Sequence, residues 1–155
     1  MTKRAFKPAD FATLSPYLTV RDVKKALEFY QKAFGFSIRD ENSLDEDEEL
    51  VHAEMAFGDA TLMLGKEGAF GDESKSPVTS KIASPISFYI YCPDVDVLFA
   101  QATKAGAEVV MPCDLMFWGD RMCRLRDPDG LEWCFATNVA EHMPKPEHHH
   151  GPGCC

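Results

Sequence analysis

The chain shows an ordered succession of strand and helix patterns from its fourteenth residue onward. Residues 14–20 alternate between two faces, as side chains on a β-strand do. Apolar positions then recur at intervals of three and four over residues 23–30, which is typical of one face of a helix. Asp22 precedes this stretch as an N-cap, and Gly35 follows it as a helix stop. Strand patterns resume in three further segments, at residues 36–40, 49–57 and 60–64.

The second half of the chain repeats this order. A strand pattern at residues 86–92 is followed by the cap residue Asp94, a helical stripe over residues 95–102 and the helix stop Gly106. Strand patterns follow again, at residues 107–111, 121–126 and 131–137. Equivalent positions lie 71 or 72 residues apart, as in the pairs Gly35 and Gly106, Asp22 and Asp94, Ser15 and Ser87, and Tyr17 and Tyr89. This repeat predicts an α+β fold made of two tandem β-α-β-β-β modules.

The segments around the modules predict the domain organisation. Residues 1–13 form a polar lead-in, and residues 65–85 are rich in Gly, Ser, Lys and Pro, which is typical of a linker or mobile loop. Residues 139–155 form a flexible tail that is rich in His and Cys. We therefore expect one domain over residues 14–138, with its two modules at residues 14–64 and 86–137.

The charge of the chain narrows the choice of partners. Its 155 residues carry a net charge of −9, and a field of this sign repels phosphate backbones, which argues against a nucleic-acid partner. The acidic run DENSLDEDEE at residues 40–49 predicts a solvated loop. A calcium site is the alternative for this run, but the glycine and the distal Glu of an EF-hand loop are missing.

The cysteines and the apolar runs predict a cytoplasmic protein. No apolar run reaches the roughly 20 residues of a membrane-spanning helix, and the basic start of the chain lacks the apolar region of a secretion signal. Four of the six cysteines are scattered and form no C-x-x-C pair, which favours reduced core cysteines over a disulfide scaffold; they are Cys92, Cys113, Cys123 and Cys134. We therefore expect neither a membrane partner nor an oxidising compartment.

One segment resembles a known family. Residues 116–137, MFWGDRMCRLRDPDGLEWCFAT, carry F-W-G-D-R, then D-P-x-G, then a Trp and A-T, and HAE at residues 52–54 fits the same pattern. With the tandem modules, the chain resembles the vicinal oxygen chelate superfamily, which includes glyoxalase I, extradiol dioxygenases and bleomycin-binding proteins, and within it the PhnB-like branch. The chain departs from the branch pattern at three positions, Cys123, Asp129 and Leu131, where Gly, Phe and His are usual.

The resemblance implies a cup of two curved sheets whose concave face is the binding site. It also implies a homodimer, because relatives commonly exchange modules between chains and the 65–85 segment is long enough to permit this. Metal-dependent members take their ligands from the first and fourth strand of each module, which in this chain places Ser15, Met63, Ser87 and Cys134 there. Two serines and a methionine cannot complete a zinc, nickel or iron site, so we expect a cup without metal or other cofactor.

Three residues leave an enzymatic alternative open. His52 and Glu54 lie two apart on one strand and so share a face, where they could form an acid–base pair or half of a metal site. The alternative is that they are an exposed polar pair without a chemical role, on a strand whose apolar residues face the core. Asp120 is a third candidate base, next to the aromatic loop. These residues keep a metal-free isomerase or lyase in view, beside the metal-dependent lyase or dioxygenase that the missing ligands argue against.

The tail offers a second place for metal. Its histidines and cysteines bind soft or borderline metals once deprotonated; they are His148, His149, His150, Cys154 and Cys155. We interpret them as an adventitious site on a flexible appendage.

Aromatic residues suggest the ligand. Phe117 and Trp118 stand beside Asp120 and Arg121, so the rings could stack on a planar molecule while Arg121 meets an anionic end. The alternative is that Trp118 and Trp133 are core residues and that Asp120 pairs with Arg121. On the first reading, the protein binds an aromatic or amphipathic small molecule, with a site formed by Tyr17, Tyr89, Phe117, Trp118, Arg121 and Trp133. Asp127-Pro128-Asp129-Gly130 is read as a strand turn.

Overall fold

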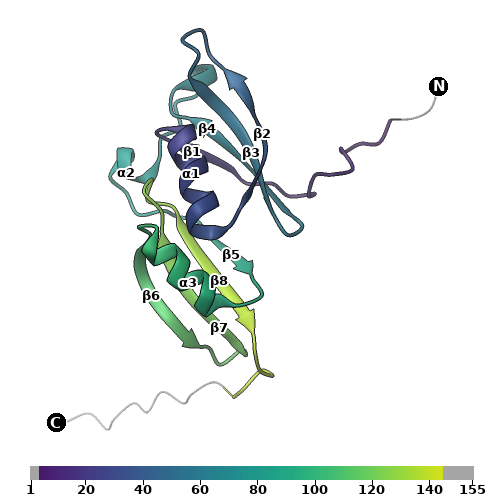
Figure 1. Ribbon diagram of the computed structural model, residues 1–155, viewed down its shortest axis with the longest axis vertical. Helices are drawn as coiled ribbons and strands as arrows, with labels where there is room; N and C mark the ends of the chain where they lie inside the picture. Colours follow the sequence, from purple (N-terminus) through teal and green to yellow (C-terminus); the bar gives the residue numbers. More distant parts are fainter. Residues whose placement is uncertain (1–3, 145–155) are drawn as a thin grey trace, which may run out of the picture.

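The computed structural model describes residues 4–144 and contains the two expected modules, one beyond the other along the long axis (Figure 1). The first module comprises β1 (Tyr17–Val20), α1 (Val23–Phe34), β2 (Ser37–Leu44), β3 (Leu50–Phe57) and β4 (Ala60–Lys66). The second comprises β5 (Ser87–Tyr91), α3 (Val95–Lys104), β6 (Glu108–Leu115), β7 (Asp120–Arg126) and β8 (Glu132–Asn138).

Each module forms one four-stranded mixed sheet. The strand orders are β1-β4-β3-β2 and β5-β8-β7-β6, and in each sheet the first and the last strand of the module pair in parallel. The helices α1 and α3 cover one face of their sheets and contact each other. The opposite face of each sheet is the concave one, and the two sheets form a curved arrangement and not a closed barrel. Residues 10–12 lie against the concave face of the first sheet, where Arg39 donates to Asp10 and the backbone N of Ala12 donates to Thr61. Among residues 4–144, no helix has the length and apolar character needed to cross a membrane.

The predicted caps form the helix ends. Asp22 accepts a hydrogen bond from the backbone N of Lys25 at 2.9 Å, and Gly35 ends α1 with φ 73°. Asp94 accepts from the backbone nitrogens of Asp96 and Val97 at the start of α3. Because the side-chain oxygens satisfy backbone N–H groups that the first turn leaves free, these residues fix where the helices begin.

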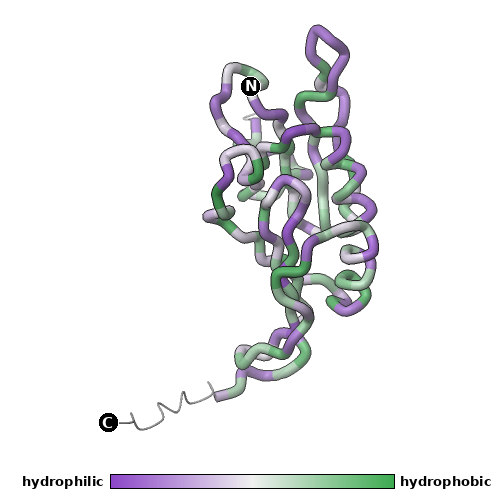
Figure 2. Tube along the Cα trace, turned by 90° about the vertical axis from the view of Figure 1, so that its left-hand side faces the viewer, coloured by the Kyte–Doolittle hydropathy of each residue, from purple (hydrophilic) through white to green (hydrophobic). Residues whose placement is uncertain are grey.

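Three strands run two or more residues past their sequence patterns, and one of them is β4, which continues to Lys66 and so includes the first two residues of the expected linker. The strand β2 continues to Leu44 and β6 to Leu115, and both contain register shifts against their partners. Such bulges break the alternation by which a strand is recognised. The prediction of a solvated loop over residues 40–49 was therefore wrong for residues 40–44, which belong to β2. The remaining turn is the hydrophilic loop at the top of Figure 2.

The segment between the modules contains ordered structure. Residues 69–71 form a 3-10 turn, and α2 (Pro77–Ser80) begins at Ser76, whose Oγ accepts from the backbone N of Thr79. Ser76 is fully buried, and the backbone N of Val78 donates to the carbonyl of Asp129 at 3.1 Å. The segment is thus attached to the second module.

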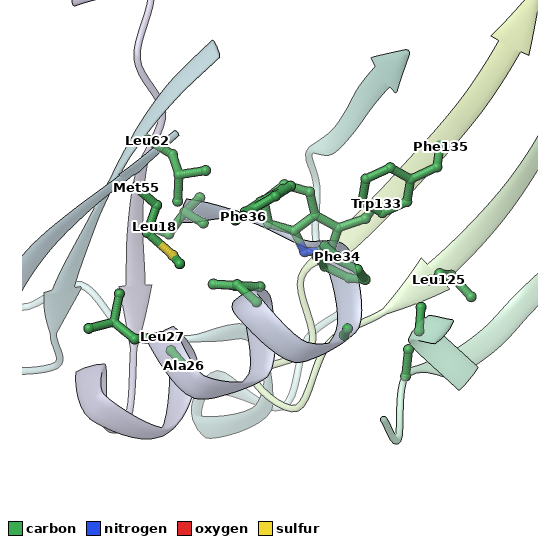
Figure 3. Packing of buried hydrophobic residues seen from close by; sticks show 14 of the residues in the cluster. Leu18, Ala26, Leu27, Phe34, Phe36, Met55, Leu62, Leu125, Trp133 and Phe135 are labelled. Atoms are coloured by element: carbon green, nitrogen blue, oxygen red, sulfur yellow. The ribbon is translucent and has the colours of Figure 1, made fainter. Parts of the chain in front are cut away.

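Apolar side chains between the helices and the sheets form one core that spans both modules. Figure 3 shows Trp133 of β8 lying among Phe34 and Phe36 of the first module, with Phe135 and Leu125 beyond it. The ring centroids of Trp133 and Phe34 are 5.4 Å apart, and those of Trp133 and Phe36 are 5.5 Å apart. Burial of such large rings is the main attraction that joins the two modules.

Candidate functional site

Aromatic side chains gather on the concave face of the second sheet. Tyr89 and Tyr91 on β5 are 43% and 60% exposed, and Trp118 precedes β7. The two tyrosine hydroxyls donate to Oδ2 of Asp120 at 2.7 and 2.8 Å, and Trp118 Nε1 donates to the same oxygen at 3.1 Å. Asn138 donates to the other carboxylate oxygen at 3.0 Å. Asp120, itself 1% exposed, therefore holds three rings, and we call Tyr89, Tyr91 and Trp118 the aromatic platform.

The protonation states keep this network intact. Burial alone would raise the pKa of Asp120, but hydrogen bonds from its four donors outweigh burial and hold the pKa below its ordinary value. Desolvation, together with the neighbouring carboxylate, raises the pKa of Tyr89 to about 12. At neutral pH Asp120 is thus a carboxylate and Tyr89 a donor. A buried carboxylate that already accepts four hydrogen bonds is unsuited to remove a proton from a substrate, so Asp120 is not a suitable base.

The loop before β7 has a fixed shape. Gly119 has φ 95°, and a Cβ there would lie 2.1 Å from a backbone oxygen of the chain that follows β8, so only glycine fits. The backbone N of Met143 donates to the carbonyl of Phe117 at 2.7 Å, and the Phe117 ring lies edge-on to Trp118. The first residues of the expected tail, 139–144, thus contact this loop.

Arg121 lies on the opposite face of β7 from the aromatic platform. Its guanidinium donates twice to Asp96 of α3, both times at 2.7 Å. The expected place of Arg121 beside the rings was therefore wrong, and so was the alternative that Asp120 pairs with Arg121. Adjacent residues on a strand point to opposite faces, and Asp120 faces the platform while Arg121 faces the helix.

Trp133 also lies away from the platform. Its side chain is 2% exposed, in the core, and Nε1 donates to Oδ2 of Asp127 at 2.9 Å. Its expected place among the ligand-contacting rings was wrong, because β8 turns Trp133 toward the helices. The alternative interpretation placed both tryptophans in the core and paired Asp120 with Arg121. It is confirmed for Trp133 only, because Trp118 is partly exposed and Asp120 does not pair with Arg121.

The turn after β7 joins the modules, which the sequence did not indicate. Asp127 accepts from Tyr30 of α1 at 2.6 Å as well as from Trp133. Arg21, also in the first module, donates from Nε to Asp129 at 2.9 Å. Burial is the largest influence on Asp127 and raises its pKa, although its hydrogen bonds act in the other direction. Asp-Pro-Asp-Gly is thus a turn, as predicted, and in addition a contact between modules.

Ionisable side chains occupy the concave face of the first sheet. His52 Nδ1 lies 3.4 Å from the hydroxyl of Tyr17, and His52 Nε2 lies 3.9 Å from a carboxylate oxygen of Glu54. Arg39 Nε lies 3.9 Å from the other oxygen of Glu54. The Tyr17 ring lies over Gly65, where a Cβ would come within 2.5 Å of its hydroxyl. An imidazole between a phenol and a carboxylate is an arrangement that can transfer protons.

The positions that bind metal in metal-dependent relatives do not form a metal site. Ser15 is hydrogen-bonded to Thr61 at 2.6 Å on the first sheet, where Met63 also lies, and Ser87 and Cys134 belong to the second sheet. Burial raises the pKa of the Cys134 thiol, which disfavours the thiolate that a metal needs. Hydroxyls, a thioether and a protonated thiol do not fit zinc, nickel or iron.

Other potential metal ligands in the described part of the chain are scattered as well. Within residues 4–144, no three His, Cys, Asp or Glu side chains gather so as to hold a metal ion. The five tail candidates lie outside the described residues; they are His148, His149, His150, Cys154 and Cys155.

Known proteins are similar to this chain in sequence. The family model described as Glyoxalase/Bleomycin resistance protein/Dioxygenase superfamily matches residues 11–135. The uncharacterised protein Mb0911c of Mycobacterium bovis is 35% identical over 130 residues, which cover 83% of this chain and 84% of the relative. Rv0887c of Mycobacterium tuberculosis is 35% identical over 130 residues, which cover 83% of this chain and 75% of the relative.

Solved structures show the same fold. TioX from Micromonospora sp. ML1 has a TM-score of 0.64 and 22% identity, covering 83% of this chain and all (100%) of that one. A glyoxalase/bleomycin resistance protein/dioxygenase family enzyme from Burkholderia phytofirmans PsJN has a TM-score of 0.64 and 16% identity, with coverage of 83% and 100%. The matched family model, the tandem modules and the solved neighbours agree: the chain belongs to the glyoxalase/bleomycin resistance protein/dioxygenase superfamily, also called the vicinal oxygen chelate superfamily.

Proposed function

We propose that the protein binds an aromatic or amphipathic small molecule, without a metal, on the concave face of its second sheet. The observation that carries this proposal is the aromatic platform, in which partly exposed rings are held by a buried carboxylate. Rings that are fixed before a ligand arrives lose little conformational freedom on binding. The apolar floor beneath them, formed by Met122, Cys134 and Ala136 with Met111 and Met116 beside them, suits a flat apolar body.

Truncation of Trp118 tests this proposal. The probes are quinoline, N-methylquinolinium and 1-naphthoate, which share a bicyclic ring and differ in charge, and calorimetry measures their affinities. Trp118→Ala should weaken the best-bound probe by about 2 kcal/mol or more, as truncation of a central aromatic contact does. Phe70→Ala is the matched control, because Phe70 is a 75% exposed ring far from the platform in sequence. Equal affinities in Trp118→Ala and the unmodified chain would refute the assignment.

The metal-free state has its own test. Chelator-washed protein that ends at residue 141 lacks the His and Cys tail, and elemental analysis should find no stoichiometric nickel, zinc or iron in it. Retained metal would instead support the metal-dependent lyase or dioxygenase.

We further propose a homodimer that carries two equivalent cups, each built from both chains. The support is that Tyr89 and Tyr91, on the concave face of the second sheet, are 43% and 60% exposed. Sedimentation at micromolar concentration should show a species of twice the 17.3 kDa chain mass, and a 17.3 kDa species would contradict the dimer. We also assign the chain to the PhnB-like branch, on the motif at residues 116–137, and to the cytoplasm, on its four free cysteines among the described residues.

A second candidate function is proton transfer on the first sheet. It is favoured by the position of His52 between Tyr17 and Glu54. Chelator-washed protein would then isomerise the hemithioacetal of methylglyoxal and glutathione, and His52→Gln would abolish the turnover. Turnover that survives this substitution would exclude His52 as the base.

A further inference from the structure

A groove of about 530 Å³ runs beside the aromatic platform, between β5 and the turn that joins β3 to β4. Its apolar lining includes Phe57, Pro93 and the two platform tyrosines, Tyr89 and Tyr91. The rings of Tyr89 and Tyr91 stand at 66° to each other with centroids 5.6 Å apart. A ligand in this groove would contact aromatic surface from more than one direction.

The ionic groups at the groove are all acidic. Asp59, in the β3–β4 turn, is the charged residue among those that line it, and the salt bridges found among residues 4–144 do not involve Asp59. Asp120 adds a second carboxylate behind the tyrosine hydroxyls. Of two arginines on β7, Arg121 pairs with Asp96 on the helix side, and Arg124, on the platform side, pairs with Glu132 at 2.6 Å.

The hydroxyl hydrogen bonds strengthen the attraction of the rings for positive charge. A phenol that donates to a carboxylate gains electron density on its ring, and the face of an electron-rich ring attracts cations. Tyr89 and Tyr91 both donate to the same Asp120 oxygen. A cation seated against these rings gains from the ring faces and from the carboxylates, whereas an anion is repelled by both.

We propose that the groove binds an organic cation, specifically a flat aromatic or alkylated ammonium compound whose positive charge lies between Asp59 and the platform tyrosines. This inference rests on the proposed function and gives its ligand a charge. The ligand is thus a cation, whereas placing Arg121 at the site would predict an anionic ligand. A net charge of −9 on the chain adds a long-range attraction of the same sign.

Calorimetry with the three bicyclic probes tests the charge. At pH 7.5 quinoline is neutral, N-methylquinolinium is a cation and 1-naphthoate is an anion. We expect N-methylquinolinium to bind at least tenfold more tightly than quinoline, and 1-naphthoate to bind most weakly. The preference should shrink as salt is raised, because the charge on Asp59 is exposed and screened.

Two substitutions locate the cation. Asp59→Asn should reduce the preference for N-methylquinolinium over quinoline several-fold. The matched control Asp47→Asn, which removes a charge that is also exposed but lies in a different turn, should leave the preference unchanged. Tyr91→Leu should weaken the cation about tenfold. Because Tyr91 is 60% exposed, its loss does not open the core, and circular dichroism can verify that the variant is folded.

The outcomes separate this inference from the proposed function. Equal affinity for cation and neutral probe, or equal effects of Asp59→Asn and Asp47→Asn, would overturn the organic cation while leaving an aromatic binding site. Failure of all three probes to bind would overturn both. If Tyr91→Leu shifts a monomer–dimer equilibrium and N-methylquinolinium does not bind, the groove is covered by a second copy of the chain and the inference is wrong.

Discussion

Two buried carboxylates, Asp120 and Asp127, have almost the same partners and different surroundings. Each accepts a hydrogen bond from a tryptophan nitrogen, and Asp127 accepts from one tyrosine hydroxyl whereas Asp120 accepts from two. The donors to Asp127, Tyr30 and Trp133, are 1% and 2% exposed and belong to the core that joins the modules. Two donors to Asp120, Tyr89 and Tyr91, are exposed on the concave face.

The difference shows how one kind of network can serve stability or recognition. Around Asp127 the rings turn inward, and the carboxylate satisfies donors that water cannot reach. Around Asp120 the rings turn outward, and the carboxylate fixes a surface that a ligand can contact. The pKa values of the two carboxylates also differ. Burial raises the pKa of Asp127, whereas hydrogen bonds lower the pKa of Asp120 despite its burial.

The largest expected effect comes from removing the inner carboxylate. Asp127→Ala leaves the Tyr30 hydroxyl and the Trp133 indole nitrogen without a partner in the core, which should lower the free energy of unfolding by about 3–5 kcal/mol. Urea denaturation followed by circular dichroism measures this loss. A loss below about 1 kcal/mol would show that the junction does not depend on the carboxylate.

Removing the outer carboxylate should cost less stability. In Asp120→Ala the hydroxyls of Tyr89 and Tyr91 can turn to water, so we expect a loss of about 1–2 kcal/mol in the same urea experiment. Binding of the aromatic probes should suffer more than stability does, because the rings are no longer held. The comparison fails if Asp120→Ala destabilises the protein as much as Asp127→Ala.

The two carboxylates should give pH dependences of opposite sign. Asp127 has a folded-state pKa above 3.8, so the folded chain holds more protons than the unfolded chain just above that pH, and its contribution to stability falls as pH rises through this range. Asp120 has a folded-state pKa below 3.8, so its contribution rises with pH and is lost as the pH falls through that lower pKa.

Urea denaturation between pH 3 and pH 7 measures the sign of both pH dependences. The stability of the unmodified chain relative to Asp127→Asn should decrease with pH, and that relative to Asp120→Asn should increase. Each tenfold change in proton affinity corresponds to about 1.4 kcal/mol. Slopes of the same sign in the two comparisons would contradict the assigned shifts.

The smallest effect on probe binding should come from a substitution on the helix-facing side of β7. Arg121→Ala removes an ion pair with Asp96 that is exposed to water. The affinities of the three aromatic probes should stay unchanged in calorimetry, because Arg121 does not face the platform. A selective loss of 1-naphthoate binding would return Arg121 to the site.

Most of the fold follows from local patterns. The helical stripes predict the buried residues of α1, and Asp22 and Gly35 predict its ends. The far ends of β2 and β6 were missed, because bulges interrupt the alternation there. The role of the Asp-Pro-Asp-Gly turn was missed for another reason: Tyr30 and Asp127 are 97 residues apart, and no local pattern connects them.

The placement of the side chains at the candidate site was predicted in part. The exposed face of β5 follows from alternation, which places Tyr89 and Tyr91 together. Alternation could also have corrected Trp133, because Cys134 was placed on the concave face and neighbours on a strand point in opposite directions. The orientation of Arg121 depends on where β7 begins, and the pattern started that strand one residue late, after Asp120. The groove beside Asp59 brings together separate segments and has no signature in the sequence.

The position of Trp133 has a consequence for how the chain acquires its structure during synthesis. The ring completes the packing around Phe34 and Phe36, although it is made about 100 residues after them. While the ribosome is adding the second module, the aromatic side of the first helix has no cover. We therefore expect the nascent first half to reach its final form only after β8 has emerged, so that the two repeats become native together.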